Sequence, residues 1–358
     1  MRCLARPLVP LRPRPHPLPI STTARSPAGP RVLTLPLLLA IAAAGCGQQG
    51  ITLSGSSAGD ETTASTSGSG SAGGAGGAGG AGGGEPGKPL TLVDWNLHNF
   101  FDTTGQIGTD ALSPDDYAAK RKTIGATLKQ LAPDVAVVAE IETKAVLDDL
   151  NTNELGGVYS ATAITDSTDV REIAILSKVP FDSVVSHLQD TFVLAGMNGP
   201  QYHYTRDCLE AHLTWNGRKI IVLGVHFRSK VAPDDPDKRL AEAQHTRAIA
   251  DALAMKDPTA AIVILGDFND TPDSEPYAAV AGMAPSLFTD ASAAVAEDQR
   301  YSYVYQGMKQ LIDHQMANPI FAGMLDKKSV RLVHGKGIDD SSKYASDHTP
   351  ILGVYSVR

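Results

Sequence analysis

Cysteine is nearly absent from this 358-residue chain, which contains only Cys3, Cys46 and Cys208. The first two fall in a segment that we interpret below as a leader, so Cys208 would be alone in the mature protein. A single cysteine forms no internal disulfide and cannot supply the thiolate set of a cysteine-based zinc site. A disulfide framework and a zinc-finger type of site are therefore excluded for the mature chain.

Positive charge is also scarce once the N-terminal segment is set aside. Residues 1–46 hold six arginines and no acidic residue. Taking those six from the 31 basic residues of the chain leaves 25 against 39 acidic residues, a formal charge of −14. General polyanion binders usually carry a basic surface, so this balance disfavours a protein that coats nucleic acid. It does not exclude an enzyme that attracts phosphate locally through a metal ion.

The N-terminal segment contains no apolar run of comfortable membrane-spanning length. The stretch RVLTLPLLLAIAAAGC has a positive flank and an apolar core of the length found in signal peptides. Its small residues followed by Cys46 resemble the lipobox of bacterial lipoproteins, which implies lipidation of Cys46. We therefore interpret residues 1–46 as a signal peptide and expect a lipid-anchored protein of the bacterial cell envelope. The alternative is an ordinary secretory signal and a secreted protein.

The rest of the chain divides into a tether and a folded domain. Residues 47–88 are rich in Gly, Ser, Ala and Thr, cannot bury apolar surface, and are predicted to be a flexible tether. Residues 89–358 alternate strand and helix signals. Ser113-Pro114 predicts the start of a helix, and Asn216-Gly217 predicts a hairpin with a type I′ turn. A second helix is predicted over 236–255, and buried strands over 90–96, 134–142, 172–178 and 261–266. This mixture indicates an α/β domain with mixed sheets.

Polar residues end or follow six apolar segments of this domain. They are Asn96, Glu140, His226, Asp267 with Asn269, Asp313, and Asp347 with His348. An unpaired buried carboxylate costs on the order of several kcal/mol, so we expect these residues to converge on one rim and share partners. Oxygen ligands suit Mg²⁺, Mn²⁺ or Ca²⁺. Asp267 and Asn269, two positions apart, point the same way at a strand end and are placed to hold a water that attacks phosphorus.

The segments WNLHN, AEIE, HFRSK, GDFND, LIDH and SDHTPI occur in this order and resemble the endonuclease/exonuclease/phosphatase superfamily, which has the DNase I-like fold. The resemblance extends over essentially all of residues 89–358. It implies an α/β fold, a four-layer α/β sandwich in which two mixed β-sheets pack face to face with helices outside. It also implies divalent-metal-dependent hydrolysis of phosphodiesters or phosphomonoesters at one edge of the sheets.

The resemblance assigns roles to individual residues. Glu140 is implied as the principal metal ligand, with help from Asn96 and Asp347. Asp267 is implied to orient or deprotonate the attacking water, and Asn269 to assist it and contact the phosphate. The bound ion would be Mg²⁺ or Mn²⁺, with Ca²⁺ as a further option.

The resemblance also implies a group of residues around the phosphate. His348 and Asp313 match the His–Asp pair of the family, and His226 matches its second histidine. The resemblance implies that these residues stabilise charge on the phosphate. Glu172 and Asp169 are both candidates for the carboxylate that partners His226. Further substrate contacts are implied for Arg206, Arg171 and Arg228.

Other polar residues are assigned ordinary structural roles. Asp270 and Asp273 are predicted turn residues, while Arg239 and Arg247 fit surface charges as well as phosphate contacts. Several histidines are predicted to be structural or exposed: His98, His203, His212, His245 and His314.

The function predicted from these observations is that of a surface-anchored or secreted nuclease. HFRSK and YSYVYQG favour secreted nucleases, with DNA preferred over RNA as substrate and a monomeric enzyme. The alternative is a phosphatase or phosphodiesterase that acts on inositol phosphates or phospholipid head groups. A catalytically inactive binding protein is disfavoured because every central position holds a competent residue. Specificity is expected to lie in the loops 102–113, 190–203 and 228–238.

Overall fold

The computed structural model describes residues 87–105, 111–165, 171–231, 233–340, 343–344 and 346–358. The predicted signal peptide with Cys46, most of the predicted tether, and Asp169 lie outside the described residues. Within the described part, no helix combines the length and apolar character needed to cross a bilayer.

Two six-stranded mixed sheets form the centre of the domain. The first has the strand order β15-β16-β1-β2-β4-β3 and the second has the order β11-β14-β10-β9-β8-β5. β1 is parallel to β2, and β9 is parallel to β10, whereas the other neighbouring strands are antiparallel. The bounds of the first sheet are β1 (Lys88–Phe100), β2 (Val135–Ile141), β3 (Ala161–Ile164), β4 (Glu172–Ser177), β15 (Leu325–Leu332) and β16 (Ile351–Val357). Those of the second are β5 (Phe181–Ser186), β8 (Leu209–Trp215), β9 (Arg218–His226), β10 (Ala261–Asp267), β11 (Thr289–Asp290) and β14 (Asp313–Ala317).

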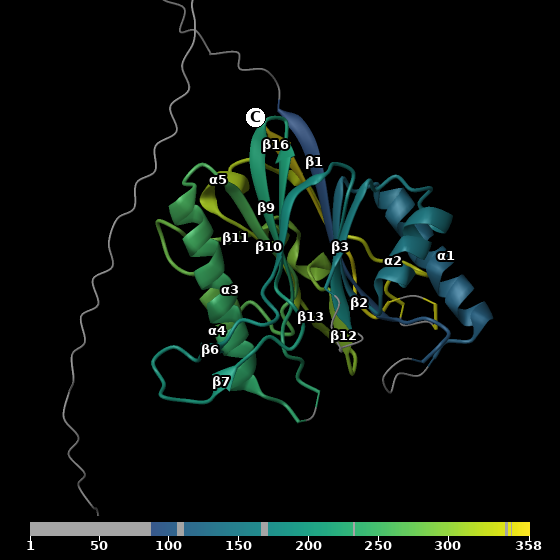
Figure 1. Cartoon of the computed structure of the whole chain (residues 1–358), viewed down its shortest axis with the longest axis horizontal. Coiled ribbons are helices and arrows are strands. Elements are labelled where there is room, and N and C mark those ends of the chain that lie inside the picture. Colours follow the sequence, from purple (N-terminus) through teal and green to yellow (C-terminus); the bar gives the residue numbers. More distant parts are fainter. Residues whose placement is uncertain (1–86, 106–110, 166–170, 232, 341–342, 345) are drawn as a thin grey trace, which may run out of the picture. The chain divides into compact units, whose positions relative to one another are not determined.

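Helices cover the outer face of each sheet (Figure 1). Ile124 and Leu128 of one helix share an apolar cluster with Trp95 of β1, while Ala243 of another packs with Ile262 of β10. The predicted four-layer α/β sandwich is thereby confirmed. The helices are α1 (Pro114–Leu131), α2 (Lys144–Asp149) with a π-helical turn (Leu150–Glu154), α3 (Pro236–Lys256), α4 (Glu275–Ala281) and α5 (Pro319–Ala322). Short 3₁₀ turns span Ala291–Ala294 and Glu297–Gln299, and two small hairpins pair β6 (Phe192–Val193) with β7 (Gln201–Tyr202) and β12 (Tyr303–Tyr305) with β13 (Met308–Gln310).

The local signals in the sequence are confirmed where they are strong. The Ser113 hydroxyl accepts the backbone N–H of Asp116 at 3.2 Å, which caps α1. Asn216 and Gly217 have φ values of 50° and 76°, the pair of positive angles that a type I′ turn requires. The strands that the sequence did not reveal include the edge strands β5 and β15, whose side chains are largely exposed. Exposed strands lack the apolar run from which a buried strand is inferred.

The space between the two sheets changes from apolar to polar along β1. Its inward side chains are, in order, Leu90, Leu92, Asp94 and Asn96. The two leucines belong to the apolar cluster shared by both sheets, and Asp94 Oδ1 accepts the Gln315 side-chain amide across the interface at 2.7 Å. Burial, followed by the charge of Asp313, raises the pKa of Asp94 well above its usual range. The sheets are thus held together at one end by apolar packing and open at the other into a polar rim.

A chain of ion pairs fixes the segment that follows β5. His187 Nδ1 lies 2.9 Å from Asp190 Oδ2, and His187 Nε2 lies 3.1 Å from Glu210 Oε2. Because both ring nitrogens face carboxylates, His187 is an imidazolium. Burial by itself would raise the pKa of Glu210, but hydrogen bonds from His187 and His212 outweigh it and lower this pKa to about 2.

Glu210→Gln is expected to destabilise the domain in a pH-dependent way. A carboxyl group whose pKa falls from 4.5 to about 2 on folding stabilises the protein above pH 4.5, and this contribution disappears as the pH falls towards 2. We expect the free energy of unfolding at pH 7 to fall by on the order of 2 kcal/mol, and the deficit to shrink below pH 4. Urea denaturation at pH 7 and pH 3.5 measures it, with the exposed Glu297→Gln as control. A deficit that stays constant with pH would contradict the assignment.

Candidate active site

The predicted polar residues meet where β1, β2, β9 and β10 end, at one edge of the two sheets. Asn96 of β1 connects the sheets, because its Nδ2 donates to Asp267 Oδ2 at 3.0 Å and to Glu140 Oε1 at 3.3 Å. Gly266 allows β10 to run close to β9 just before Asp267. Its φ is 133°, and a Cβ there would lie 2.1 Å from the carbonyl oxygen of Val225.

Asp267 lies at the centre of this cluster and is 2% exposed. Its Oδ2 is 3.5 Å from His226 Nε2 and 3.9 Å from His348 Nε2. Burial and the nearby Asp313 carboxylate raise the pKa of Asp267 to about 7. A carboxyl group with this pKa can both lose and accept a proton at neutral pH, which suits a general base.

Asn269 reaches the same place through a turn rather than through strand alternation. β10 ends at Asp267, and Asn269 has a φ of 53°. Its backbone N–H donates to Asp267 Oδ1 at 2.7 Å, and its side-chain Nδ2 donates to the Phe227 carbonyl at 3.0 Å. The two residues therefore lie together as predicted, but an Asx-type turn brings them together.

His348 and Asp313 form the predicted pair. Asp313 begins β14 directly opposite Asp267 on β10, and His348 Nδ1 lies 2.8 Å from Asp313 Oδ2. Burial would lower the pKa of His348, but the charge of Asp313 reverses this effect and raises it to about 10. His348 is therefore an imidazolium at neutral pH, with Nε2 directed towards Asp267.

His226 differs from His348 in its charge. Burial lowers the pKa of His226 well below its usual value, and the positive charges of Arg206, His348 and Arg171 lower it further. His226 can thus donate one hydrogen bond but supplies no positive charge. Its Nδ1 has no hydrogen-bond partner among the described residues, so Glu172 does not fill that role there.

The predicted metal ligands form the more open side of the cluster. Glu140 has a φ of 61° where the register between β2 and its neighbours shifts, and its Oε2 accepts the Asn99 N–H at 2.8 Å. Arg171 Nε lies 3.9 Å from the same oxygen. Strained backbone of this kind is found at sites that the surrounding fold holds in place.

The donor atoms fit a hard divalent cation. Asp267, Asp313 and His348 present ligand atoms within 4.8 Å of one another. His348, however, is an imidazolium that donates to Asp313, so a metal on those three would have to break that pair. Glu140, the Asn96 Oδ1 and Asp347 instead offer oxygen atoms, which Mg²⁺ and Mn²⁺ prefer. We therefore favour the predicted ligands Glu140, Asn96 and Asp347.

Two site residues were missed by the sequence analysis. His98 was expected to be structural or exposed, but its Nδ1 lies 3.2 Å from Asp347 Oδ1. Lys120 of α1 is 3% exposed, and burial lowers its pKa to about 8 against the opposing charges of Asp347 and Glu140. The available signal was its position on the helix face that also carries Tyr117 and Ile124.

The predicted arginines separate into different environments. Arg171 donates from Nε to Asn99 Oδ1 at 2.8 Å and lies at the site. Arg206 is buried, and its positive charge lowers the pKa of His226. Arg228 donates to the Pro233 carbonyl at 2.8 Å within its own loop, so its contact with substrate stays a prediction.

Three neighbouring residues have structural roles that the sequence did not indicate. Arg239 is buried rather than on the surface, and its Nε donates to Asp270 Oδ2 at 2.9 Å. Asp270 is correspondingly more than a turn residue, because it also accepts Lys230 Nζ at 2.7 Å. Arg247 is buried as well and donates to the carbonyl groups of Val280 and Ala281.

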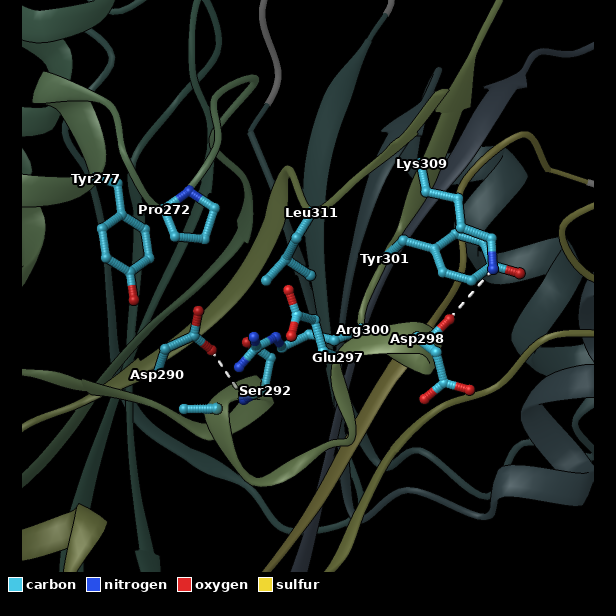
Figure 2. Close-up of a pocket in the computed structure, with 11 residues that line it drawn as sticks. Pro272, Tyr277, Asp290, Ser292, Glu297, Asp298, Arg300, Tyr301, Lys309 and Leu311 are labelled. Carbon is cyan, nitrogen blue, oxygen red and sulfur yellow. Dashed lines mark hydrogen bonds between the residues drawn. The ribbon is translucent and has the colours of Figure 1, made fainter. Parts of the chain in front are cut away.

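A cavity of about 630 Å³ lies outside this cluster (Figure 2). It is bordered by α4, β11 and the segment that leads into β13, and no predicted site residue lines it. Asp290, on its wall, lies 2.8 Å from the buried His314, whose structural role is thereby confirmed. The convergence of catalytic groups, rather than cavity size, identifies the active site.

Comparisons with known proteins agree with this geometry. A family model described as "Endonuclease/Exonuclease/phosphatase family" matches residues 91–339. A search of curated proteins finds no match. Truncated TDP2 from Caenorhabditis elegans is 17% identical with a TM-score of 0.52, covering 75% of this chain and 98% of that one.

Two further solved structures show the same fold. The human Nocturnin catalytic domain with bound sulfate anion is 13% identical with a TM-score of 0.54, covering 75% of this chain and 95% of that one. An endonuclease/exonuclease/phosphatase from Bacteroides vulgatus is 13% identical with a TM-score of 0.52, covering 76% and 100%. At these identities the structures establish the fold, and the family model establishes the family. The chain therefore belongs to the endonuclease/exonuclease/phosphatase family and is a phosphoesterase of that family, whose members typically use a divalent metal.

Proposed function

We propose that this chain is a divalent-metal-dependent phosphodiester hydrolase that acts as a nuclease. The observation that carries the proposal is the position of Asp267. One of its oxygens faces Asn96, His226 and His348 within 3.9 Å, and the other accepts the Asn269 N–H. The general base Asp267 is therefore surrounded by the amide groups of two asparagines, the neutral donor His226 and the cationic donor His348.

The chain's own groups divide the work of an in-line attack on phosphorus. Asp267 accepts the proton of the attacking water, and Asn269 helps to orient that water. The His348 imidazolium, charged because of Asp313, donates from Nε2 to a phosphate oxygen. His226 contributes a hydrogen bond but no charge. Because hydrogen bonds to neighbouring groups hold Asp267, Asn269 and His348, these three need little reorganisation as the reaction proceeds.

Glu140, Asn96 and Asp347 are the residues that would hold the metal, and Mg²⁺ or Mn²⁺ suits them best. When bound, a divalent ion supplies Lewis-acid stabilisation of the negative charge that develops on the phosphate. Ca²⁺ is an additional option because the same oxygen donors accept it.

Nucleic acid is the proposed substrate, with DNA preferred over RNA. Zebrafish TDP2, which is 16% identical with a TM-score of 0.50, was solved with a single-strand DNA product. Arg171 and Arg206 give this site local positive charge in a chain whose net charge is −8.

We further propose that the protein acts outside the cytoplasm, anchored in the bacterial cell envelope through Cys46 or secreted. The support is the apolar stretch before Cys46 and the Gly-rich segment that follows it. Fractionation of cells that express the wild type or Cys46→Ala tests the anchor. Wild-type protein in the membrane fraction and variant in the soluble fraction are expected, and identical distributions would refute lipidation.

Plasmid nicking provides the test of the nuclease function. The purified protein is expected to nick supercoiled DNA with Mg²⁺ or Mn²⁺ and to lose this activity completely with EDTA. Agarose gel electrophoresis measures the conversion, and protein without added metal serves as a control. Intact plasmid alongside hydrolysis of an inositol phosphate or a phospholipid would replace the nuclease with that alternative substrate class.

A further inference from the structure

The β12–β13 hairpin brings aromatic side chains to the active site. Tyr303 forms an isolated β-bridge with His348, and their ring centroids are 4.9 Å apart. Tyr305 follows two residues later, with its ring centroid 6.5 Å from that of Tyr303 and the two planes inclined by only 15°. The two phenol rings therefore follow one another outward from the His348 imidazolium, the group proposed above to donate to the phosphate.

Strand geometry places both tyrosines on one face of the hairpin. Residues two apart on a strand point the same way, and residues that pair across strands share a face. Met308 pairs with Tyr305 and lies on that face, whereas Val304 and its partner Lys309 lie on the other. Lys309 is directed away, since its Nζ lies 3.9 Å from the ring centroid of Tyr301.

The fold does not explain these aromatic side chains. Tyr305 is 49% exposed and Met308 is 57% exposed, and neither belongs to an apolar cluster of the domain. Exposed apolar surface that adjoins a catalytic site is typical of a binding surface. The turn that joins the strands consists of Gln306 and Gly307, so no apolar side chain occupies its two central positions.

We propose that the tyrosine face of this hairpin stacks on the nucleobase of the nucleotide that adjoins the scissile phosphate, with Tyr305 as the principal contact. This inference rests on the proposed nuclease function and narrows the preferred substrates to those with an unpaired base at that position, which a supercoiled plasmid offers where its strands separate. A base in a duplex has both faces covered by its neighbours, whereas a single strand or a frayed end leaves a face free for a phenol ring. Stacking on tyrosine does not depend on base identity, so little sequence preference is expected.

The test compares two single-stranded oligonucleotides that differ in one base. Each has a single cleavable phosphodiester, and in the second the adjoining nucleoside is an abasic tetrahydrofuran. Tyr305→Ala is expected to lower kcat/KM on the first substrate roughly 5- to 100-fold. The kcat/KM of the wild type should fall by a similar factor when the abasic oligonucleotide replaces the first one. The kcat/KM of Tyr305→Ala on the abasic oligonucleotide should be little lower than with either change alone.

Two variants serve as controls. Tyr305→Phe keeps the ring and should retain most of the rate on the base-bearing oligonucleotide. Val304→Ala, on the opposite face of the same strand, should behave as the wild type. Tyr305 is chosen over Tyr303 because Tyr303 touches His348, and its removal would disturb the catalytic imidazolium.

Three results would overturn the proposal. If Tyr305→Ala lowers kcat/KM by the same factor on both oligonucleotides, the side chain supports the catalytic residues and does not stack on a base. If the oligonucleotide rates are unchanged while binding to phosphatidylglycerol vesicles is lost, the face contacts lipid. If the wild type hydrolyses bis(4-nitrophenyl) phosphate with Mn²⁺ but cleaves neither oligonucleotide, the nuclease function itself fails.

Discussion

Asp267→Asn is expected to lower kcat for phosphodiester hydrolysis by about 10³- to 10⁴-fold, the upper part of the range for general-base catalysis. Asparagine preserves the size of the side chain, and its one acceptor oxygen can keep the Asn269 N–H as a partner, while the hydrogen bond from the Asn96 amide is lost. It removes the group that accepts a proton from water. Steady-state kinetics with saturating Mn²⁺ and an aryl phosphodiester measure the change without any assumption about the natural substrate.

Stability distinguishes this catalytic loss from misfolding. A carboxyl group whose pKa rises from 3.8 to about 7 on folding destabilises the metal-free protein once the pH exceeds 3.8. Replacing it by a neutral amide should therefore leave the Tm of the metal-free protein at pH 7 unchanged or raise it. Asp273→Asn, in the exposed turn nearby, is the matched control and should keep full activity. A fully active Asp267→Asn protein would show that another group accepts the proton.

Glu140→Gln is expected to raise the Mn²⁺ concentration needed for half-maximal activity by at least about 100-fold and to lower the maximal rate. Loss of a residue that merely orients a ligand costs 10- to 100-fold in metal affinity, and loss of a ligand's charge costs more. The amide oxygen of glutamine can still accept the Asn99 N–H, so the strained backbone at this position keeps its support. Calorimetric titration with Mn²⁺ and rate measurements over a range of Mn²⁺ concentrations provide two independent readouts.

Glu142→Gln is the matched control for this prediction. Glu142 lies two residues further along, is buried, and accepts the backbone N–H of Asp102. Its replacement is expected to affect the loop that begins at Asp102 but not the affinity for metal. If Glu142→Gln weakened metal binding and Glu140→Gln did not, the assignment of the principal ligand would be wrong.

The sequence by itself determined the fold class and most of the residues that meet at the site. This was possible because its signals are local: apolar runs that each end in Asn96, Glu140, His226 or Asp267, and short motifs in the order of the family. Parallel strands that end in polar residues leave few arrangements in which those residues are not close together. The same reasoning could not find β5 and β15, because the side chains of these edge strands are mostly exposed and the sequence there shows no apolar run.

Only the tertiary structure decided what charge each group carries and which basic residues belong to the site. His226 and His348 are the same residue type at comparable depth, yet one is neutral and the other charged, because Asp313 lies against only one of them. Lys120 resembles any helical lysine until the fold buries it within reach of the charges of Asp347 and Glu140. Burial and long-range charge depend on residues far apart in the chain, so protonation and catalytic competence become defined only when the sheets close on each other.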